Sequence, residues 1–194
     1  MDNIYFSSDL HLGHNREFVV DERGFESVED HDAAIVNNWN STVDKSDEVY
    51  LLGDLMLGDV ENGLRLLKTL NGKIHIVRGN HDTDEKIKRY LECENVQEVI
   101  DAKFLRYGSI TFYLSHFPTL VSHEKLKKMK NAVVNLYGHT HQKDNFYKLN
   151  DDPHPYMYHV GLDSHNLYPV MLDSIIEEVR NEKNNYDGRH QISE

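Results

Sequence analysis

The sequence contains very little cysteine and no long apolar stretch. Cys93 is the only cysteine among 194 residues, which excludes a disulfide framework and a cluster of thiolate metal ligands. No apolar run approaches the roughly 20 residues that a membrane-spanning helix needs. The N-terminal stretch MDNIYFSSD is acidic and lacks the basic and apolar regions of a signal peptide. We therefore expect a cytoplasmic protein with no membrane partner.

Basic charge is also scarce. The 21 Lys and Arg residues are outnumbered by 33 Asp and Glu residues, which gives a formal net charge of −12. Such a field repels the phosphate backbone of nucleic acids, so nucleic acid is not an expected partner. Histidine, in contrast, occurs 13 times. Neutral imidazole is a common ligand of divalent metals, so a chain rich in histidine and poor in cysteine favours a metal enzyme. The composition leaves the oligomeric state open.

The length of the chain suits one domain. We expect this domain to cover residues 1–180, and we expect the polar tail 181–194, which lacks hydrophobic periodicity, to be frayed or disordered. Runs of apolar and β-branched residues predict strands at Ile4–Ser8, Glu48–Leu52, Lys73–Val77, Val96–Ile100, Ala102–Arg106, Ile110–Leu114, Val133–Tyr137 and Met157–Val160.

Helical periodicity fills most of the intervals between these strands. It predicts helices over residues 27–43, Val60–Leu67, Asp84–Leu91 and Ser122–Lys130, and a last helix from Asp173 or Ser174 to about Asn184. We interpret Asn71–Gly72 as the C-cap of the second helix. Strands alternate with helices in the first half and cluster in the second. This order predicts an α/β fold whose sheet is mixed rather than purely parallel.

Polar side chains follow five of the predicted strands at the point where each strand ends. IYFSSDLH ends in Asp9 and His11, VYLLGD in Asp54, IHIVRGNHD in Asn80, His81 and Asp82, ITFYLSH in His116, and VVNLYGHTH in His139 and His141. The carboxyl ends of neighbouring strands share one edge of an α/β sheet, and ligands bind at that edge. We therefore expect these side chains to meet.

The spacing within two of these motifs suits a shared target. In Asp9–Leu10–His11 and in His139–Thr140–His141, residues i and i+2 project to the same side if the chain is extended. Each pair would then face one region, while the residue between them points away.

Seven of these side chains are good ligands for a divalent cation: Asp9, His11, Asp54, Asn80, His116, His139 and His141. Seven is too many for one tetrahedral ion. If one carboxylate bridges, each of two ions receives about four ligands, and Asp54 is the natural bridge near the centre of the sheet. Two cations about 3.5–4 Å apart form a clamp for in-line displacement at phosphorus. These donors suit manganese, iron, zinc or nickel, and we expect manganese first.

The motifs D-x-H, G-D, G-N-H-D, a lone H and G-H-x-H occur in an order that resembles the calcineurin-like metallophosphoesterase superfamily. Small single-domain bacterial and phage phosphoesterases, which open with a stretch similar to DLHLGH, are the most similar group. The resemblance spans residues 4 to about 172. It implies a sandwich of two sheets flanked by helices, and hydrolysis of a phosphate ester.

The resemblance also implies a role for each motif residue. One ion would take Asp9, His11, Asp54 and His141, and the other would take Asp54, Asn80, His116 and His139. A hydroxide shared by the ions would attack phosphorus. His81 would be the general acid, and Asp82 would fix its tautomer and raise its pKa. His14, Asn15 and Arg16 are weaker candidates for contacts with the substrate phosphate.

The motifs restrict the substrate only in part. After Gly53–Asp54 the chain reads LMLGD, whereas protein phosphatases of the superfamily carry an acid and an arginine in a pattern similar to GDxxDRG. We therefore expect a small phosphomonoester or phosphodiester, nucleotides included, rather than a phosphoprotein.

Two other functions stay open. One is a metal-dependent nuclease, because DNA-repair nucleases of the superfamily also open with D-x-H-L-G. The other is a metal-binding scaffold, similar to the retromer subunit that lacks the catalytic histidine. The presence of His81 favours catalysis.

Several further residues are assigned no role by the sequence. Asp163 and His165 follow another strand-like stretch. They could line the rim of the pocket, but we favour a simple loop. We interpret the remaining histidines as surface, strand or loop residues: His31, His75, His123, His154, His159 and His190.

Overall fold

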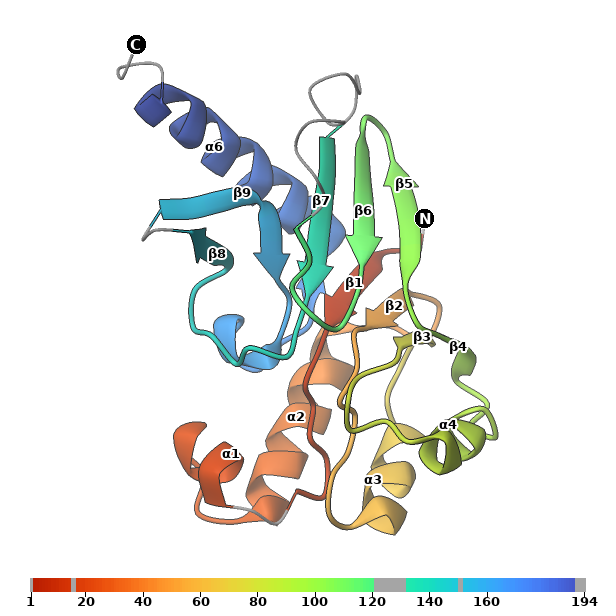
Figure 1. Ribbon diagram of the computed structural model, residues 1–194. Helices are drawn as coiled ribbons and strands as arrows, with labels where there is room; N and C mark the ends of the chain where they lie inside the picture. Colours follow the sequence, from red (N-terminus) through yellow and green to blue (C-terminus); the bar gives the residue numbers. More distant parts are fainter. Residues whose placement is uncertain (1, 15–16, 121–131, 150–151, 191–194) are drawn as a thin grey trace.

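The computed structural model describes residues 2–14, 17–120, 132–149 and 152–190. They form two five-stranded sheets, and both sheets are mixed. Figure 1 shows the first sheet with helices α2, α3 and α4 in the lower half, and the second sheet with helix α6 in the upper half. The predicted α/β fold with two mixed sheets flanked by helices is therefore confirmed. Among the described residues, no helix has the length and apolar character that crossing a membrane requires.

The first sheet has the strand order β10-β1-β2-β3-β4. Strands β1 (Ile4–Ser7), β2 (Glu48–Leu51), β3 (Lys73–Val77) and β4 (Val96–Ile100) run parallel, and the edge strand β10 (Val170–Met171) is antiparallel to β1. The helices of this half are α1 (Glu17–Glu22), α2 (Val28–Thr42), α3 (Val60–Leu67) and α4 (Asp84–Tyr90). Parallel strands connected through helices bring their carboxyl ends to one edge.

The second sheet has the order β5-β6-β7-β9-β8. Its central strands β6 (Ile110–Leu114), β7 (Ala132–Tyr137) and β9 (Asp152–His159) are parallel, while the edge strands β5 (Lys103–Tyr107) and β8 (Phe146–Leu149) are antiparallel to their neighbours. A short 3-10 helix, η1 (Leu162–Ser164), follows β9, and helix α6 (Leu172–His190) ends the described chain.

Both faces of the first sheet are buried, because alternate residues of each strand enter different cores. In β2, Val49 and Leu51 belong to the core between the sheet and its helices, whereas Tyr50 belongs to the core between the two sheets. Trp39 of α2 is fully buried in the first core. Phe6 of β1 lies in the second core and stacks on Tyr50. This packing fixes the two sheets relative to each other.

Four short elements were not predicted: helix α1, strand β8, the 3-10 helix η1 and strand β10. Helix α1 and strand β10 have six and two residues, too short to produce a periodic pattern. Strand β8 is partly exposed, and β9 begins at Asp152 in a stretch, DPHPYMYH, whose prolines are typical of loops and strand edges. The predicted helix Ser122–Lys130 lies outside the described residues. The predicted cap at Asn71–Gly72 is wrong, because α3 ends at Leu67 with Lys68 as its C-cap.

The expectation of a frayed tail is wrong for residues 181–190, because α6 continues to His190. The last turns are polar, so they carry no apolar stripe for sequence analysis to detect. Ion pairs support this part of the helix: Lys183 pairs with Asp187 at 3.3 Å, and Arg189 contacts Glu182 at 2.7 Å and Asp152 at 3.0 Å. The boundary of the domain at residue 180 stays a prediction.

His159 lies fully buried at the end of β9. Its Nδ1 lies 2.8 Å from the Ser164 hydroxyl, which donates to the carbonyl of Gly161, so Nδ1–H is the donor to Ser164. The Nε2 atom has no hydrogen-bond partner among the described residues. Burial lowers the pKa of His159 from 6.5 to about 3. The ring is therefore neutral in the folded protein at every pH above that value.

We expect this histidine to make stability depend on pH. Below about pH 6.5 the unfolded chain binds a proton at His159 that the folded chain does not, so the free energy of unfolding falls as the pH falls toward 3. The slope is about 1.4 kcal/mol per pH unit for one proton. Urea unfolding in EDTA at pH 7, 6 and 5 should show wild type losing stability relative to His159→Asn, with a loss that approaches this rate between pH 6 and 5 and is smaller between pH 7 and 6. A difference that does not change with pH would contradict the assignment.

Candidate metal centre

Asp9 follows the end of β1 and is fully buried. Its Oδ2 atom accepts a hydrogen bond from the backbone N–H of His139 at 2.8 Å, whereas Oδ1 has no hydrogen-bond partner among the described residues. Burial raises the pKa of Asp9 above its ordinary value. A buried carboxylate oxygen without a donor is costly unless a cation or proton neutralises it.

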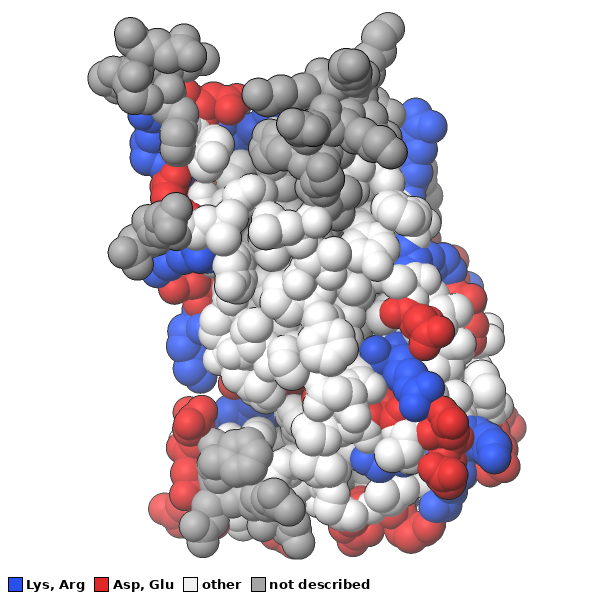
Figure 2. Space-filling view, viewed as in Figure 1, with Lys and Arg blue, Asp and Glu red and all other residues white. Residues whose placement is uncertain are grey.

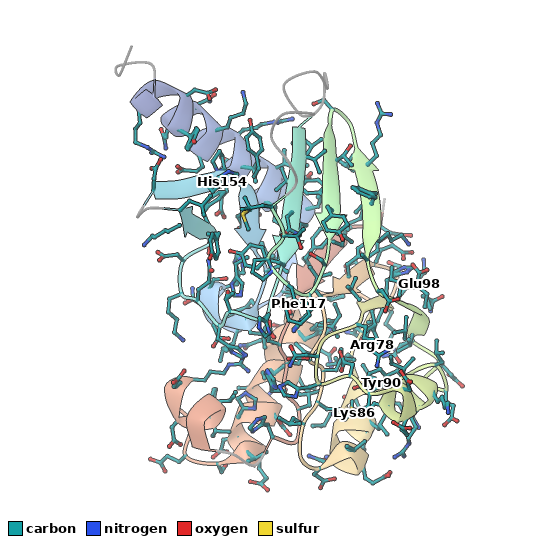
Figure 3. All side chains as sticks on the ribbon, viewed as in Figure 1. Arg78, Lys86, Tyr90, Glu98, Phe117 and His154 are labelled. Carbon is teal, nitrogen blue, oxygen red and sulfur yellow. The ribbon has the colours of Figure 1, made fainter. Side chains whose placement is uncertain are left out.

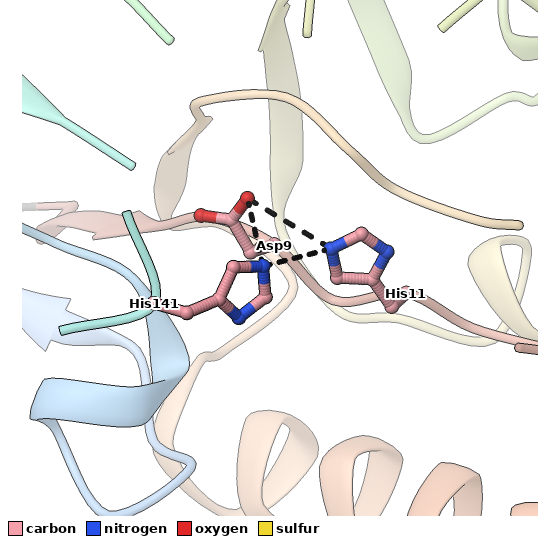
Figure 4. A group of neighbouring side chains, drawn as sticks. All are labelled: Asp9, His11 and His141. Carbon is pink, nitrogen blue, oxygen red and sulfur yellow. Dashed lines mark hydrogen bonds and ion pairs between the residues drawn. The ribbon is translucent and has the colours of Figure 1, made fainter. Parts of the chain in front are cut away.

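Asp9, His11 and His141 form the first ligand group (Figure 4). The two Nε2 atoms lie 3.2 Å apart, and Asp9 Oδ1 lies 4.0 Å from that of His11 and 3.9 Å from that of His141. Burial lowers the pKa of His11 well below its ordinary value, so this imidazole is neutral and offers a lone pair. Three donor atoms from two separate loops therefore face one small region.

Asp54, His116 and His139 form the second ligand group. Asp54 Oδ2 lies 3.5 Å from His116 Nε2, and the amide oxygen of Asn80 lies 2.9 Å from the same nitrogen. His116 Nδ1 donates to the carbonyl of Leu52 at 2.8 Å, which leaves Nε2 turned toward Asp54 and Asn80. All seven predicted ligands thus occur in or beside two neighbouring clusters.

The donor geometry fits divalent cations. Donor atoms held about 2.1 Å from one ion lie roughly 3.0–3.4 Å from each other, and the distances in both groups are close to this range or slightly larger. The atoms are carboxylate oxygens, an amide oxygen and imidazole nitrogens, which are common ligands of manganese, iron, zinc and nickel. Asp9 Oδ1 has no hydrogen-bond partner among the described residues, which favours a cation beside this oxygen.

The backbone of this centre is strained. Asp9, His11, Asp54, His139 and His141 all have positive φ angles, between 49° and 68°. Among the described non-glycine residues, only Asn166 and Leu167 share this property. Left-handed backbone costs non-glycine residues about 1–2 kcal/mol each, and it persists where the surroundings enforce it, often at functional sites. The prediction that the D-x-H and H-x-H motifs are extended is therefore wrong: their side chains converge through left-handed turns.

Residues 3–152 match a protein family described as the calcineurin-like phosphoesterase superfamily domain. The chain belongs to this superfamily. It is 28% identical to the Gene 66 protein of Mycobacterium phage L5, with 84% of this chain and 88% of that protein covered. It is 29% identical to the uncharacterized protein MJ1445 of Methanocaldococcus jannaschii, with 94% of both covered. The fold is also similar to that of the Aquifex aeolicus protein of unknown function AQ665, with a TM-score of 0.67, 23% identity, and 91% and 99% of the two chains covered.

The carboxylate of Asp54 is held in place by its neighbours. Its Oδ1 accepts the backbone N–H of His81 at 2.9 Å. Burial would raise the pKa of Asp54, but the hydrogen bond and charge of His116 outweigh it and lower the pKa to about 2. Asp54 is therefore an anion in the folded protein near neutral pH. Its contact with His116 lies within the second ligand group, and its predicted role as a bridge between two ions stays a prediction.

Asp82 has a different role from the predicted one. Its carboxylate is buried and accepts hydrogen bonds from the backbone amides of Asp54, Leu55 and Gly79 and from the Tyr90 hydroxyl. None of these donors is the His81 ring, so the prediction that Asp82 fixes the tautomer of His81 is wrong. Asp82 instead ties the loop after β2 to the loop after β3. Tyr90, labelled in Figure 3, supplies its hydroxyl from the last residue of α4.

His81 lies at the edge of the centre. Its side chain is 42% exposed, and its Nε2 lies 3.9 Å from Asp54 Oδ2. Lys86 donates to the carbonyl of His81 at 2.8 Å and to that of Met56 at 2.7 Å, which holds this loop through its backbone. The ring itself is partly exposed to solvent.

Of the three weaker candidates for contacts with the substrate phosphate, only His14 is among the described residues. His14 is 1% exposed, and its ring lies edge-on to His11 with 5.4 Å between centroids. It therefore packs against a ligand rather than facing solvent. Asn15 and Arg16 lie outside the described residues.

The sequence did not predict a buried polar network on the Nδ1 side of His141. Asp163 Oδ2 accepts a hydrogen bond from His141 Nδ1 at 2.9 Å, and Arg23 contacts both oxygens of Asp163. Burial alone would raise the pKa of Asp163, but the hydrogen bonds from His141 and Arg23 hold it far below its ordinary value. His31 is fully buried and contacts Arg23, so its interpretation as a surface, strand or loop residue is wrong. The sequence offered one signal, an aspartate directly after a strand-like stretch.

The centre depends on glycines that allow close approach. A methyl group at Gly138 would overlap the hydroxyl of Ser8 and the carboxylate of Asp9. We expect Gly138→Ala to weaken the binding of divalent ions at least tenfold and to lower the melting temperature, because Asp9 must move. Isothermal titration with Mn²⁺ and thermal melts measure the two effects.

Gly188→Ala is the matched control, because nothing lies within 4 Å of a methyl group at that position in α6. It should leave ion binding unchanged and slightly stabilise the helix. Normal Mn²⁺ binding by Gly138→Ala would show that the approach of β7 to Asp9 is not required.

Proposed function

We propose that the protein is a phosphoesterase that requires two divalent metal ions and hydrolyses a small phosphomonoester or phosphodiester. The observation that carries this proposal is the meeting of two ligand groups, one around Asp9 and one around Asp54, at the carboxyl ends of strands from both sheets. Membership of the phosphoesterase superfamily supports the same reaction class. Manganese is our first choice of ion, and a cytoplasmic location stays a prediction.

The protein supplies the geometry of the reaction. When bound, two divalent ions supply hydroxide at neutral pH and positive charge beside the phosphoryl oxygens. The chain holds five of their ligands in left-handed backbone, so little reorganisation is needed when substrate binds. We propose that the carboxylate of Asp54 lies between the two ligand groups and serves both.

His81 is our candidate general acid. Its side chain is 42% exposed, and its ring centroid lies 5.9 Å from that of His11. A ring at the solvent-facing edge of the centre can reach the oxygen of a departing alcohol, whereas a buried ligand cannot. Donation of a proton to that oxygen removes the cost of expelling an alkoxide.

The surroundings of the centre favour a leaving group with an apolar or aromatic part. Phe117 directly follows His116 and is 49% exposed. Its ring lies 4.6 Å from that of His139 and 5.0 Å from that of His116, measured between centroids. Figure 3 shows Phe117 at the junction of the two halves of the molecule. A nucleobase or aryl ring could stack there, which supports nucleotides as candidate substrates.

A nuclease is the second candidate function and is less favoured. The net charge of −12 opposes a long nucleic-acid backbone. Figure 2 shows that the centre of the viewed face is uncharged, with basic and acidic side chains interspersed at its margins instead of a continuous basic surface. The scaffold alternative is less favoured because His81 accompanies both ligand groups.

An activity panel tests the proposed function. The Mn²⁺-loaded protein is assayed with aryl phosphate monoesters and diesters, then with linear and cyclic nucleotides, and finally with single-stranded and duplex DNA. We expect turnover of a small ester, its loss after chelation, and recovery when Mn²⁺ is restored. Cleavage of DNA alone would favour the nuclease, and stoichiometric metal binding without turnover of any ester would favour the scaffold.

The role of His81 gives a sharper prediction. His81→Ala should bind metal normally and lose about 10²–10⁴-fold in kcat toward an alkyl ester, whose leaving group needs a proton. The loss toward a p-nitrophenyl ester should be much smaller, because that leaving group is a weak base.

His75→Gln is the matched control. His75 lies earlier on the same β3 segment, where it contacts Glu48 and Glu98, and this change should leave both rates unaltered. Equal losses with both esters in His81→Ala would rule out proton donation to the leaving group.

A further inference from the structure

The ring of His141 is oriented by a hydrogen bond at the nitrogen that faces away from its ligand group. Its Nε2 faces Asp9 and His11, while its Nδ1 lies 2.9 Å from Asp163 Oδ2. An imidazole has only these two nitrogens, so the contact with Asp163 fixes which nitrogen is free to bind an ion. The His141 side chain is 30% exposed and follows β7 on a loop, so packing alone constrains it less than the other members of its group.

Asp163 is in turn fixed by a buried guanidinium. Arg23 Nε donates to Oδ1 at 3.0 Å and an Arg23 terminal nitrogen donates to Oδ2 at 2.8 Å, which is a two-pronged contact of defined geometry. The two side chains are only 1% and 4% exposed. The exposed Lys143 adds a contact with Oδ1 at 3.6 Å. The carboxylate thus keeps one orientation.

The same guanidinium also holds the backbone of the first motif. Arg23 donates to the carbonyl of Asp9 at 2.8 Å and to that of Leu10 at 3.4 Å. It also lies 3.0 Å from His31 Nε2, and because Arg23 can only donate, His31 carries its own proton on Nδ1. That proton faces Asp32, 3.1 Å away.

Asp32 is the last member of this network, and it contacts the far end of the loop that begins at Asp9. Its other oxygen accepts the backbone N–H of Gly13 at 3.0 Å. The strained segment from Asp9 to Gly13 is therefore held at both ends, by Arg23 and by Asp32.

The second ligand group has a different support. His116 Nδ1 donates to a backbone carbonyl, that of Leu52, and Asp54 is fixed by the amide of His81. None of the hydrogen bonds or ion pairs described for Arg23 and Asp163 involves a member of this group. A change in the network should therefore act on one ligand group and spare the other.

We propose that the buried Arg23–Asp163 pair is a positioning device for the first ligand group, linking the backbone of Asp9 to the ring of His141, and that it sets the affinity of that group for its divalent ion. Partners of this kind are worth about 10–100-fold in metal affinity. The proposal rests on the proposed function in that the ions are the ones invoked there. It concerns metal binding, however, and requires no substrate.

Mn²⁺ binding to the whole chain tests the proposal. Free Mn²⁺ is followed by EPR during titration of chelator-treated protein, with circular dichroism to check folding. We expect two ions per wild-type chain. In Asp163→Asn, one ion should bind about 10–100-fold more weakly and the other within about threefold of wild type. Arg23→Lys keeps the positive charge but loses the bidentate contact with Asp163. It should therefore lower the affinity for the same ion.

Two further variants separate positioning from folding. Removal of one buried partner can destabilise the fold, so Arg23→Gln combined with Asp163→Asn replaces the ion pair with neutral groups of similar size. Glu61→Gln is the matched control, because it removes the carboxylate of an exposed ion pair between Glu61 of α3 and Arg89 of α4. The double variant should fold and still bind one ion about 10–100-fold more weakly than wild type, and Glu61→Gln should bind like wild type.

Several results would overturn the proposal: normal binding by the double variant, equal weakening of both ions, or fewer than two ions in wild type. A failure of the proposed function would look different. Wild type would then bind two ions without hydrolysing any ester, and Asp163→Asn would still lose one of them.

Discussion

The buried carboxylate of Asp9 is the constraint on which the rest of the centre depends. One of its oxygens accepts the backbone N–H of His139, which brings the loop after β7 of the second sheet against the loop after β1 of the first. Its other oxygen has no donor among the described residues. A charge in this position is unfavourable until a cation neutralises it. The fold therefore brings the two sheets together at a point where a divalent cation could bind.

Hydrogen bonds around Asp9 hold the strained backbone of the ligands in place. Five ligands adopt left-handed backbone, at a cost of about 1–2 kcal/mol each, and the surrounding hydrogen bonds hold them there. Asp82 ties the loops after β2 and β3, while Arg23 ties the loop after β1. Gly138 allows backbone to approach Asp9 where a side chain would collide. Much of the polar chemistry of the chain thus positions the ligands rather than contacting a substrate.

The ligands could be predicted from the sequence because each directly follows an apolar strand, and parallel strands end at one edge. The residues that hold these ligands in place could not be predicted. Arg23 lies just after a six-residue helix, and His31 lies within α2, so neither stands at a strand end. Asp163 does follow a strand, but a single aspartate is equally typical of a turn. The supposed link between Asp82 and His81 failed because adjacent residues need not face each other; tertiary contacts with Tyr90 and Asp54 decide where the carboxylate lies.

The central claim is that two cations lie between the ligands from the two sheets. Anomalous diffraction from a crystal grown with Mn²⁺ tests it most directly, because each ion gives a separate peak. We expect two peaks about 3.5–4 Å apart, one beside Asp9, His11 and His141 and one beside His116 and His139, with the Asp54 carboxylate between them. A single peak, or ions bound elsewhere on the molecule while these side chains keep their metal-free contacts, would contradict it.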